Sequence, residues 1–252
     1  MSEAARDPAT DSPTARDLAT RAGELLLAVR ARAFPDDAAR RAAGDREAHR
    51  FLVDRLAALA PGDAVLSEEG ADDPVRLTRD RVWVVDPLDG TREFAEPGRA
   101  DWAVHVALWA GGELTAGAVA LPAEGVTLST AEDRRVPDRA PGPLRLAVSR
   151  SRPAELVTGL AGRLGAELVP MGSAGVKTVA VVRGAVDAYV HAGGQHEWDS
   201  AAPVAVARAA GLHTSRVDGS PLRYNRPSPW LPDLLVCRPE LADRLLAELA
   251  AS

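Results

Sequence analysis

The sequence predicts an α/β protein made of two halves, an α+β half followed by an α/β half. Two segments with helical periodicity come first, and a set of strand-like runs follows them. A segment rich in proline and charge, residues 132–143, then interrupts the pattern. Beyond it, strand-like and helix-like segments alternate. We therefore expect an N-terminal half at residues 1–140 and a C-terminal half at residues 141–252.

In the N-terminal half, apolar residues at helical spacing predict a helix over residues 14–34. A second helix is expected to begin at Gly44 and Asp45, ahead of the apolar series that starts at Phe51. β-branched runs bounded by turn residues predict strands at residues 64–67, 81–86, 102–110 and 113–121. The two glycines between the last two of these strands indicate a hairpin.

The C-terminal half is expected to alternate between strands and helices. The predicted strands lie at residues 144–149, 167–170, 187–191 and 233–237. The predicted helices lie at residues 153–164, 174–183, 201–210 and 240–250. This alternation is typical of a sheet with helices packed on its faces.

The composition is that of an ordinary globular protein, because 46% of the 252 residues are hydrophobic and 26% are charged. A formal net charge of −6 argues against a nucleic-acid polymer as partner, since no basic field exists to displace counterions from its phosphates. No apolar run in the sequence is long enough for a membrane span or a secretory signal. Cys237 is the only cysteine, which excludes a disulfide within the chain. We expect a cytoplasmic protein with no membrane partner.

The most informative segment is residues 81–94, where a buried-strand pattern ends in two carboxylates and a glycine. Asp86 and Asp89 should converge at this strand end because the chain turns there. Two carboxylates held close together repel each other unless a proton or a cation separates them, and oxygen ligands select hard ions such as Mg²⁺ or Mn²⁺. Backbone N–H groups after Gly90, with the Thr91 hydroxyl, are suited to an anionic oxygen.

Two other acidic motifs would imply different chemistry. An EF-hand loop requires acidic or amide residues at alternate positions, and the two residues between Asp86 and Asp89 exclude it. Phosphatases with an aspartate nucleophile carry only one residue between their carboxylates, so a phosphorylated Asp86 is the less favoured alternative. An acidic turn that only caps a strand would not require the glycine and threonine that follow.

Three further acidic positions lie at the ends of predicted elements. Taken alone, Asp45 and Asp199 would each be an N-cap, and Glu68 would lie in a solvated loop. Together with the turn that carries Asp86 and Asp89, they supply the ligand set of a multi-metal phosphoesterase site.

Four motifs occur together along the chain: Ser67-Glu68-Glu69, Trp83-Val-Val-Asp-Pro-Leu-Asp-Gly-Thr91, Gly172-Ser173 with Lys177, and Glu197-Trp198-Asp199-Ser-Ala-Ala202. In order and spacing they resemble the magnesium-dependent, lithium-sensitive phosphatase superfamily of inositol monophosphatase and fructose-1,6-bisphosphatase. Within it, the segment Arg92-Glu93-Phe94 is similar to that of the 3′(2′),5′-bisphosphate nucleotidases, in particular the actinobacterial ones.

This resemblance implies a layered αβαβα sandwich and a phosphatase active in sulfur metabolism. The implied reaction is hydrolysis of the 3′-phosphate of adenosine 3′,5′-bisphosphate to AMP and phosphate, with 3′-phosphoadenylyl sulfate as a further substrate. Inositol monophosphatase activity, fructose-1,6-bisphosphatase activity and a non-catalytic sensor of phosphorylated metabolites are the alternatives. The resemblance also implies two or three Mg²⁺ ions per site, with Mn²⁺ as a substitute, and a homodimer.

The resemblance also implies a role for each site residue. Glu68, Asp86 and the Leu88 carbonyl would hold a first Mg²⁺, and Asp86, Asp89 and Asp199 would hold a second. The residues implied in catalysis, through activation of the attacking water, are Asp45, Thr91 and Glu68. The residues implied in substrate binding are Glu68, Leu88, Asp89, Gly90, Thr91, Ser149, Ser173, Lys177 and Asp199. Of these, Ser149, Ser173 and Lys177, the only lysine, would contact the remaining phosphate and the ribose.

Overall fold

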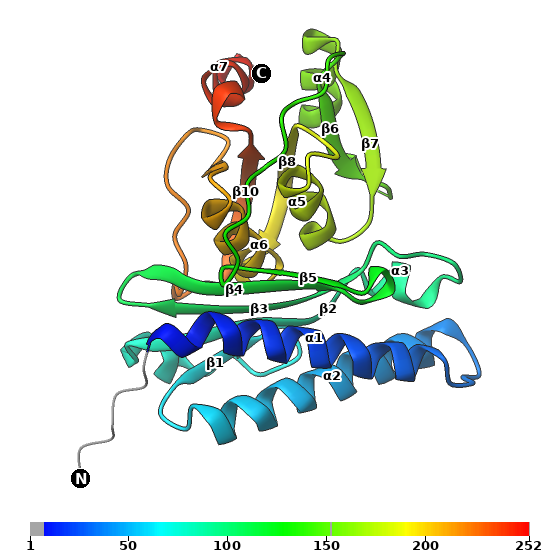
Figure 1. Ribbon diagram of the computed structural model, residues 1–252, viewed down its shortest axis with the longest axis vertical. Coiled ribbons are helices and arrows are strands. Elements are labelled where there is room, and N and C mark those ends of the chain that lie inside the picture. The colour runs from blue at the N-terminus through cyan, green and yellow to red at the C-terminus, as the bar shows by residue number, and fades with distance from the viewer. Residues whose placement is uncertain (1–7, 152, 252) are drawn as a thin grey trace.

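The computed structural model describes residues 8–151 and 153–251. Two long helices, α1 (Asp11–Arg30) and α2 (Asp37–Leu59), pack together along one face of a first sheet, as Figure 1 shows. Both predicted helices are therefore present. Their buried residues recur at helical spacing, which is the pattern that identified them in the sequence.

The predicted start of the second helix is wrong. α2 begins at Asp37, because the side chain of Asp36 caps the helix by accepting a hydrogen bond from the backbone N–H of Ala39. The alanine-rich turns that follow favour a helix although they lack large apolar residues. Asp45 therefore lies inside α2 rather than at its N-cap.

The first sheet has five strands in the order β1-β2-β3-β4-β5. Its strands are β1 (Ala64–Ser67), β2 (Arg81–Asp89), β3 (Ala103–Ala110), β4 (Glu113–Leu121) and β5 (Val126–Ser129). β1 is parallel to β2, and the other neighbours are antiparallel. The four predicted strands and the hairpin are confirmed, whereas β5 was not predicted. β2 also runs three residues further than expected, to Asp89.

The second sheet has the strand order β7-β6-β8-β10-β9. Its strands are β6 (Arg145–Ser149), β7 (Glu167–Met171), β8 (Ala188–His196), β9 (His213–Ser215) and β10 (Trp230–Cys237). β6 is parallel to β7 and β8, while β10 is antiparallel to β8 and β9. The four predicted strands are confirmed, and the three-residue β9 was not predicted.

The remaining helices are α3 (Thr91–Ala95), α4 (Glu155–Leu164), α5 (Ala174–Val182), α6 (Glu197–Ala209) and α7 (Ala242–Ala250). Short 3₁₀ helices lie at Pro8–Thr10, Pro74–Thr78, Pro122–Glu124 and Pro239–Leu241. α6 begins four residues earlier than expected, at Glu197, so Asp199 lies in its first turn and is not its N-cap. The carboxylate instead bonds back to the N-cap residue, as in a capping box.

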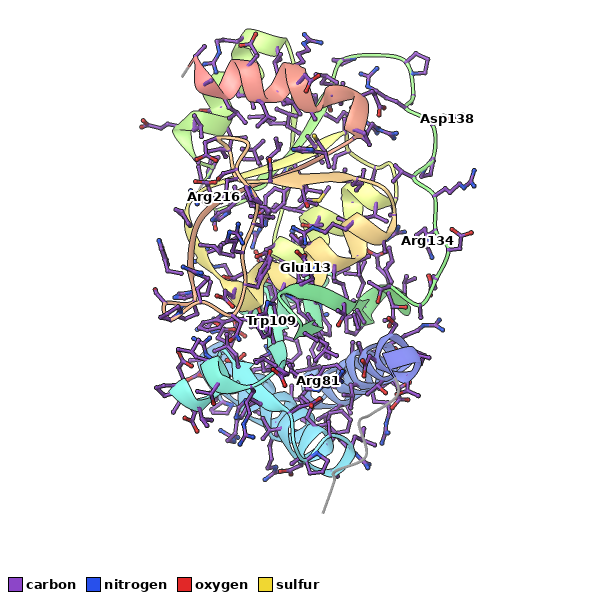
Figure 2. The ribbon with its side chains drawn as sticks, turned by 90° about the vertical axis from the view of Figure 1, so that its left-hand side faces the viewer. Arg81, Trp109, Glu113, Arg134, Asp138 and Arg216 are labelled. Atoms are coloured by element: carbon purple, nitrogen blue, oxygen red, sulfur yellow. The ribbon has the colours of Figure 1, made fainter. Side chains whose placement is uncertain are left out.

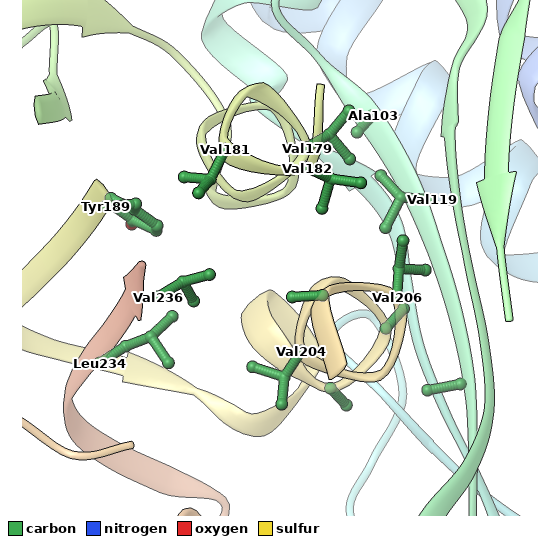
Figure 3. Packing of buried hydrophobic residues seen from close by; sticks show 14 of the residues in the cluster. Ala103, Val119, Val179, Val181, Val182, Tyr189, Val204, Val206, Leu234 and Val236 are labelled. Carbon is green, nitrogen blue, oxygen red and sulfur yellow. The ribbon is translucent and has the colours of Figure 1, made fainter. Parts of the chain in front are cut away.

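Three apolar cores define the layers. Alternate residues of β2 face opposite sides, so Trp83 and Val85 pack towards α1 and α2 while Val82 and Val84 belong to a middle core. This middle core, seen in Figure 3, joins α5 and α6 to both sheets. A third core packs α4 and α7 on the far face of the second sheet. The order is helices, sheet, helices, sheet, helices, which confirms the expected αβαβα sandwich.

The two sheets are connected by the long segment that carries Arg134 and Asp138, which Figure 2 shows along one side of the molecule. The predicted boundary between the halves falls in this segment. Because the middle core combines residues from both sheets, the two halves share much of their buried surface. The division at residue 140 stays a prediction. No helix in the described part of the chain has the length and hydrophobicity to cross a bilayer.

Candidate active site

Asp86 and Asp89 flank an irregularity in the pairing of β2 with β3. Asp86 lies opposite His105 and Asp89 lies opposite Ala103, so three residue steps on β2 match two on β3. Three steps along a regular strand would direct the two carboxylates to opposite faces, whereas a bulge restores them to one side. Pro87, which has no N–H to contribute to the ladder, lies within the bulge.

Each of the two carboxylates has one oxygen held by the backbone or by a hydroxyl. The Leu88 N–H donates to Oδ1 of Asp86 at 3.1 Å. Oδ2 of Asp89 accepts hydrogen bonds from the Ser173 hydroxyl at 2.5 Å and from the Gly175 N–H at 2.8 Å. The other oxygen of each carboxylate takes part in none of these bonds, and the side chain of Asp86 also hydrogen-bonds that of Glu68.

Glu68 and Asp199 reach the same place from two other elements. The parallel pairing of β1 with β2 places Ser67 opposite Val85, so Glu68 follows next to Asp86. Asp199, in the first turn of α6, accepts a 2.6 Å hydrogen bond from the His196 N–H through Oδ2. Four carboxylates that the sequence separates therefore lie close enough to affect one another's pKa.

The mutual repulsion of these groups is visible in their pKa values. Burial, together with the charges of Glu68, Asp89 and Asp199, raises the pKa of Asp86 well above its ordinary value. Desolvation and the charge of Asp199 raise the pKa of Glu68 to about 7, although this side chain is exposed at the rim of the site. Burial and the charge of Asp89 raise the pKa of Asp199 to about 6.

Asp89 behaves differently from the other three. Burial alone would raise its pKa, but the His105 ring and, to a smaller extent, Lys177 and Ser173 lower it to about 2. Nε2 of His105 lies 3.2 Å from Oδ2 of Asp89, in an alignment too poor for a regular hydrogen bond. Nδ1 lies 3.2 Å from the Trp198 carbonyl and 3.9 Å from Oδ2 of Asp86. His105 is therefore the main contact that lowers the pKa of Asp89.

The donor set fits a hard divalent cation. Ligand atoms of Asp86, Asp89 and His105 lie within 4.8 Å of one another, close enough to surround one ion. Oxygen donors dominate, and three carboxylates with raised pKa values would release their protons to such an ion. The sequence did not single out His105 as a site residue, because only the register of two strands brings it beside the carboxylates.

Asp45 and Thr91 lie on helices that meet beside this cluster. A Cβ atom at Gly44 would lie 2.9 Å from atoms of both Leu88 and Phe94, so glycine allows α2 to approach this closely. Desolvation and the charge of Glu69 raise the pKa of the neighbouring Asp45 to about 7.

Thr91 is the first residue of α3, and Gly90 before it has a left-handed φ of 83°. The Thr91 hydroxyl donates to the Leu88 carbonyl at 3.3 Å, which places two of the expected site groups in contact. The expected roles of Asp45 and Thr91 in activating water, and of the Gly90 and Thr91 N–H groups in holding phosphate, stay predictions.

Ser173 and Lys177 support the site from α5. Ser173 is the N-cap of α5, and its hydroxyl accepts from the Val176 N–H while it donates to Asp89. The Lys177 ammonium is buried and donates to the carbonyls of Gly172 and Ser173. Desolvation lowers the pKa of this ammonium. Both side chains therefore hold the turn before α5, and their expected contacts with substrate stay predictions.

A cavity of about 300 Å³ opens beside the cluster. Of the predicted site residues, Asp89, Asp199, Ser149, Ser173 and Lys177 line it. The sequence did not identify the other lining residues, which are Ala174, Tyr189, His191, Gly194, Gln195, His196 and Trp230. Several of these come from β8, where the sequence Tyr-Val-His-Ala followed by two glycines has the pattern of an ordinary strand end.

Comparison with known proteins gives consistent matches over most of the chain. The family model described as "Inositol monophosphatase family" matches residues 8–252. The 3′-phosphoadenosine 5′-phosphate phosphatase of Mycobacterium bovis is 54% identical over 238 residues, which cover 91% of this chain and 89% of the relative. The protein of the same name from Mycobacterium leprae is 53% identical over 94% of this chain and 92% of its own.

A solved structure shows the same architecture. The crystal structure of CysQ from Bacteroides thetaiotaomicron, a bacterial member of the inositol monophosphatase family, superposes with a TM-score of 0.77 at 29% identity. The match covers 90% of this chain and 96% of that one.

Proposed function

Because the chain belongs to the inositol monophosphatase family, we propose that it hydrolyses the 3′-phosphate of adenosine 3′,5′-bisphosphate to AMP and phosphate. 3′-Phosphoadenylyl sulfate, which carries the same 3′-phosphate, is a further substrate. The observation that carries the proposal is the convergence of Glu68, Asp86, Asp89 and Asp199, with raised pKa values at three of them, beside a cavity that Asp89 and Asp199 line. The high identity to mycobacterial relatives named for this activity supports the choice of substrate.

The carboxylates are proposed to hold two or three Mg²⁺ ions, for which Mn²⁺ can substitute. Glu68, Asp86 and the Leu88 carbonyl form one ligand group, and Asp86 joins Asp89 and Asp199 in another. When bound, these cations neutralise the phosphoryl oxygens and lower the pKa of the attacking water. The chain itself keeps Asp89 ionised, through His105, and fixes its orientation through Ser173.

The chain is proposed to supply the base and the orientation for water attack. Asp45, with a pKa of about 7, is poised to accept a proton near neutral pH. Thr91, bonded to the Leu88 carbonyl, would orient the same water. Backbone N–H groups of Gly90 and Thr91 would hold the phosphoryl oxygens. The proposed mechanism requires no phosphorylated Asp86, because this carboxylate is buried and interacts with the charges of Glu68, Asp89 and Asp199.

A substrate panel at fixed Mg²⁺ tests the proposal. The kcat/KM for adenosine 3′,5′-bisphosphate should exceed that for inositol 1-phosphate and for fructose 1,6-bisphosphate by about tenfold or more, because an additional charge-assisted contact is worth roughly 1.5–3 kcal/mol. A higher value for either sugar phosphate would overturn the substrate and leave the metal chemistry intact. Metal-dependent binding of the nucleotide without turnover would identify a sensor instead.

A further inference from the structure

Arg76 is almost completely buried, although it lies in the connection between β1 and β2, within the short 3₁₀ helix at Pro74–Thr78. Its side chain is 1% exposed. A buried guanidinium destabilises the fold unless its charge and its N–H groups are paired. Nε and Nη2 donate to the two carboxylate oxygens of Asp72 at 2.6 and 2.9 Å, which balances the charge within the same connection. Nη1 and the second N–H of Nη2 remain for other acceptors.

These donors reach the connection between β9 and β10, which belongs to the second sheet. Nη1 donates to Oδ1 of Asn225 at 2.8 Å, across 149 positions of the chain, and Nη2 donates to the Arg226 carbonyl at 2.9 Å. In return, the Asn225 amide nitrogen donates to the Arg76 carbonyl at 3.4 Å. Arg76 therefore joins a connection of the first sheet to a connection of the second.

Asn225 adopts a left-handed backbone conformation with a φ of 55°. Few residues other than glycine accept this conformation, and asparagine is one of them. The N–H groups of Asn225 and Arg226 both donate to the carboxylate of Glu197, the first to Oε2 at 2.7 Å and the second to Oε1 at 2.9 Å. Glu197 is 1% exposed, so these two bonds replace those that water would give to an exposed carboxylate.

Glu197 is the first residue of α6, and Asp199 lies in the same turn of this helix. The same connection holds this turn at two further points. The Glu197 N–H donates to the Pro229 carbonyl at 2.7 Å, and the buried hydroxyls of Ser200 and Tyr224 lie 3.1 Å apart. The position of the Asp199 carboxylate therefore depends on the connection that Arg76 bonds.

The other end of this network leads to a different carboxylate of the metal site. Glu68 directly follows β1, at the start of the connection in which Arg76 lies. We infer that Arg76 is a positioning residue for the metal site. Through Asn225 and Glu197, it fixes Asp199 relative to Glu68. This inference rests on the proposed function and adds to it a residue that bonds none of the carboxylates of the site.

The first experiment measures the affinity for Mn²⁺ by isothermal titration without substrate. In Arg76→Met, the Kd for Mn²⁺ should rise by about tenfold, because groups that orient metal ligands typically change the affinity by that amount or more. Arg81→Met is the matched control, since Arg81 also bonds two carboxylates, those of Asp11 at 2.8 Å and Asp63 at 3.0 Å. Arg81 lies at the end of β2 opposite to Asp89.

The control separates metal binding from general stability. Arg81→Met should lower Tm and leave the Kd for Mn²⁺ at the wild-type value, at a temperature at which all the variants are folded. An unchanged Kd in Arg76→Met would overturn the inference. Equal losses of affinity in the two variants would overturn it as well, because a general loss of stability would then account for both.

Asn225→Gly interrupts the same network without removing the buried charge, and it provides a test if Arg76→Met fails to fold. Glycine adopts a φ of 55° without strain and keeps the backbone N–H that bonds Glu197. The acceptor for Nη1 of Arg76 is lost, so the Kd for Mn²⁺ should rise by about fivefold, the equivalent of roughly one hydrogen bond. An unchanged Kd would overturn the role of this network.

The Mn²⁺ titration contains no nucleotide, so it also distinguishes this inference from the proposed substrate. If Arg76→Met and Asn225→Gly bind Mn²⁺ more weakly than the wild-type protein, the inference stands even where inositol 1-phosphate is the preferred substrate. Wild-type protein that binds no Mn²⁺ would overturn both the inference and the proposed metal site.

Discussion

The hydroxyl of Ser173 donates a 2.5 Å hydrogen bond to Oδ2 of Asp89, although the two residues are 84 positions apart in the chain. This bond joins the first sheet to the N-terminus of α5, across the boundary between the two predicted halves. It also fixes which oxygen of Asp89 remains for a cation. The geometry of the metal site therefore depends on how the two sheets are packed.

Removing this bond should weaken metal binding more than it changes the fold. In Ser173→Ala, the Mg²⁺ concentration for half-maximal activity should rise by about tenfold, because groups that orient metal ligands typically affect affinity by that amount or more. Thr14→Ala, an exposed hydroxyl on α1 that bonds a backbone carbonyl, is the control. An Mg²⁺ titration of both variants measures the effect, and equal curves would show that Ser173 does not position Asp89.

Asp45→Asn should reduce kcat by about a hundredfold or more, because it removes the group proposed to accept a proton from water. Metal binding should persist, since Asp45 is not among the carboxylates expected to hold the ions. Asp54→Asn, at an exposed position on the same helix, serves as the control. Isothermal titration with Mn²⁺ and steady-state kinetics separate the two effects. Loss of Mn²⁺ binding would instead assign Asp45 to the metal site.

Metal-free protein should lose stability as the pH rises through the range in which its crowded carboxyls ionise. The folded-state pKa values of Glu68 and Asp199, about 7 and about 6, lie above those of the unfolded chain. The folded protein thus binds more protons than the unfolded chain between about pH 4 and 7, and its stability falls across that window.

A divalent cation bound at these carboxylates would replace those protons, so the effect of Mg²⁺ on thermal stability should depend on pH. The increase in Tm caused by Mg²⁺ should be larger at about pH 7.5 than at about pH 5, because protons compete for the same oxygens at the lower pH. Thermal unfolding in EDTA and in excess Mg²⁺, at both pH values, measures this increase in Tm. An increase in Tm that is equal at the two pH values, or larger at the lower pH, would contradict this description of the carboxylate cluster.

The ion pair between Glu93 and Arg150 should contribute to stability, because Glu93 is buried and would be left unpaired without its partner. The two side chains meet at 2.8 Å, and Arg150 also bonds Glu96. Arg150→Ala should lower the free energy of unfolding by roughly 2–3 kcal/mol, below the full cost of breaking a fully buried pair because Arg150 is partly exposed.

The exposed pair of Arg163 with Glu248 offers a comparison, and Arg163→Ala should cost about 1 kcal/mol or less. Urea denaturation measures both values. Similar losses in the two variants would mean that the burial of Glu93 adds nothing to the strength of its ion pair.

Much of the fold was predictable because the main elements carry strong periodicity. The helices predicted over residues 14–34 and 153–164 and the predicted strands of both sheets have apolar patterns that match their burial. The elements that the sequence missed are short or depend on distant contacts. β9 has three residues, and β5 is held by its pairing with β4. The start of α2 was misplaced because alanine-rich turns carry little amphipathic signal.

The candidate site was only partly predictable. Asp86 and Asp89 were identifiable from local sequence, since a strand followed by acidic residues and glycine is distinctive. His105 was not, because its place beside Asp89 depends on the register between β2 and β3. Gln195, which lines the cavity, was not identified for a related reason, because its position depends on the pairing of β8 with β10. The positions of such residues depend on strand pairing and packing, which a short sequence motif does not predict.

The most direct test of the central claim measures phosphate release from adenosine 3′,5′-bisphosphate as a function of metal, in the wild-type protein and in Asp89→Asn. The account predicts no release in EDTA, full recovery when Mg²⁺ is restored, and a loss of about a hundredfold or more in Asp89→Asn at every Mg²⁺ concentration. Undiminished release in EDTA, or wild-type activity in Asp89→Asn, would contradict a metal-dependent phosphatase centred on these carboxylates.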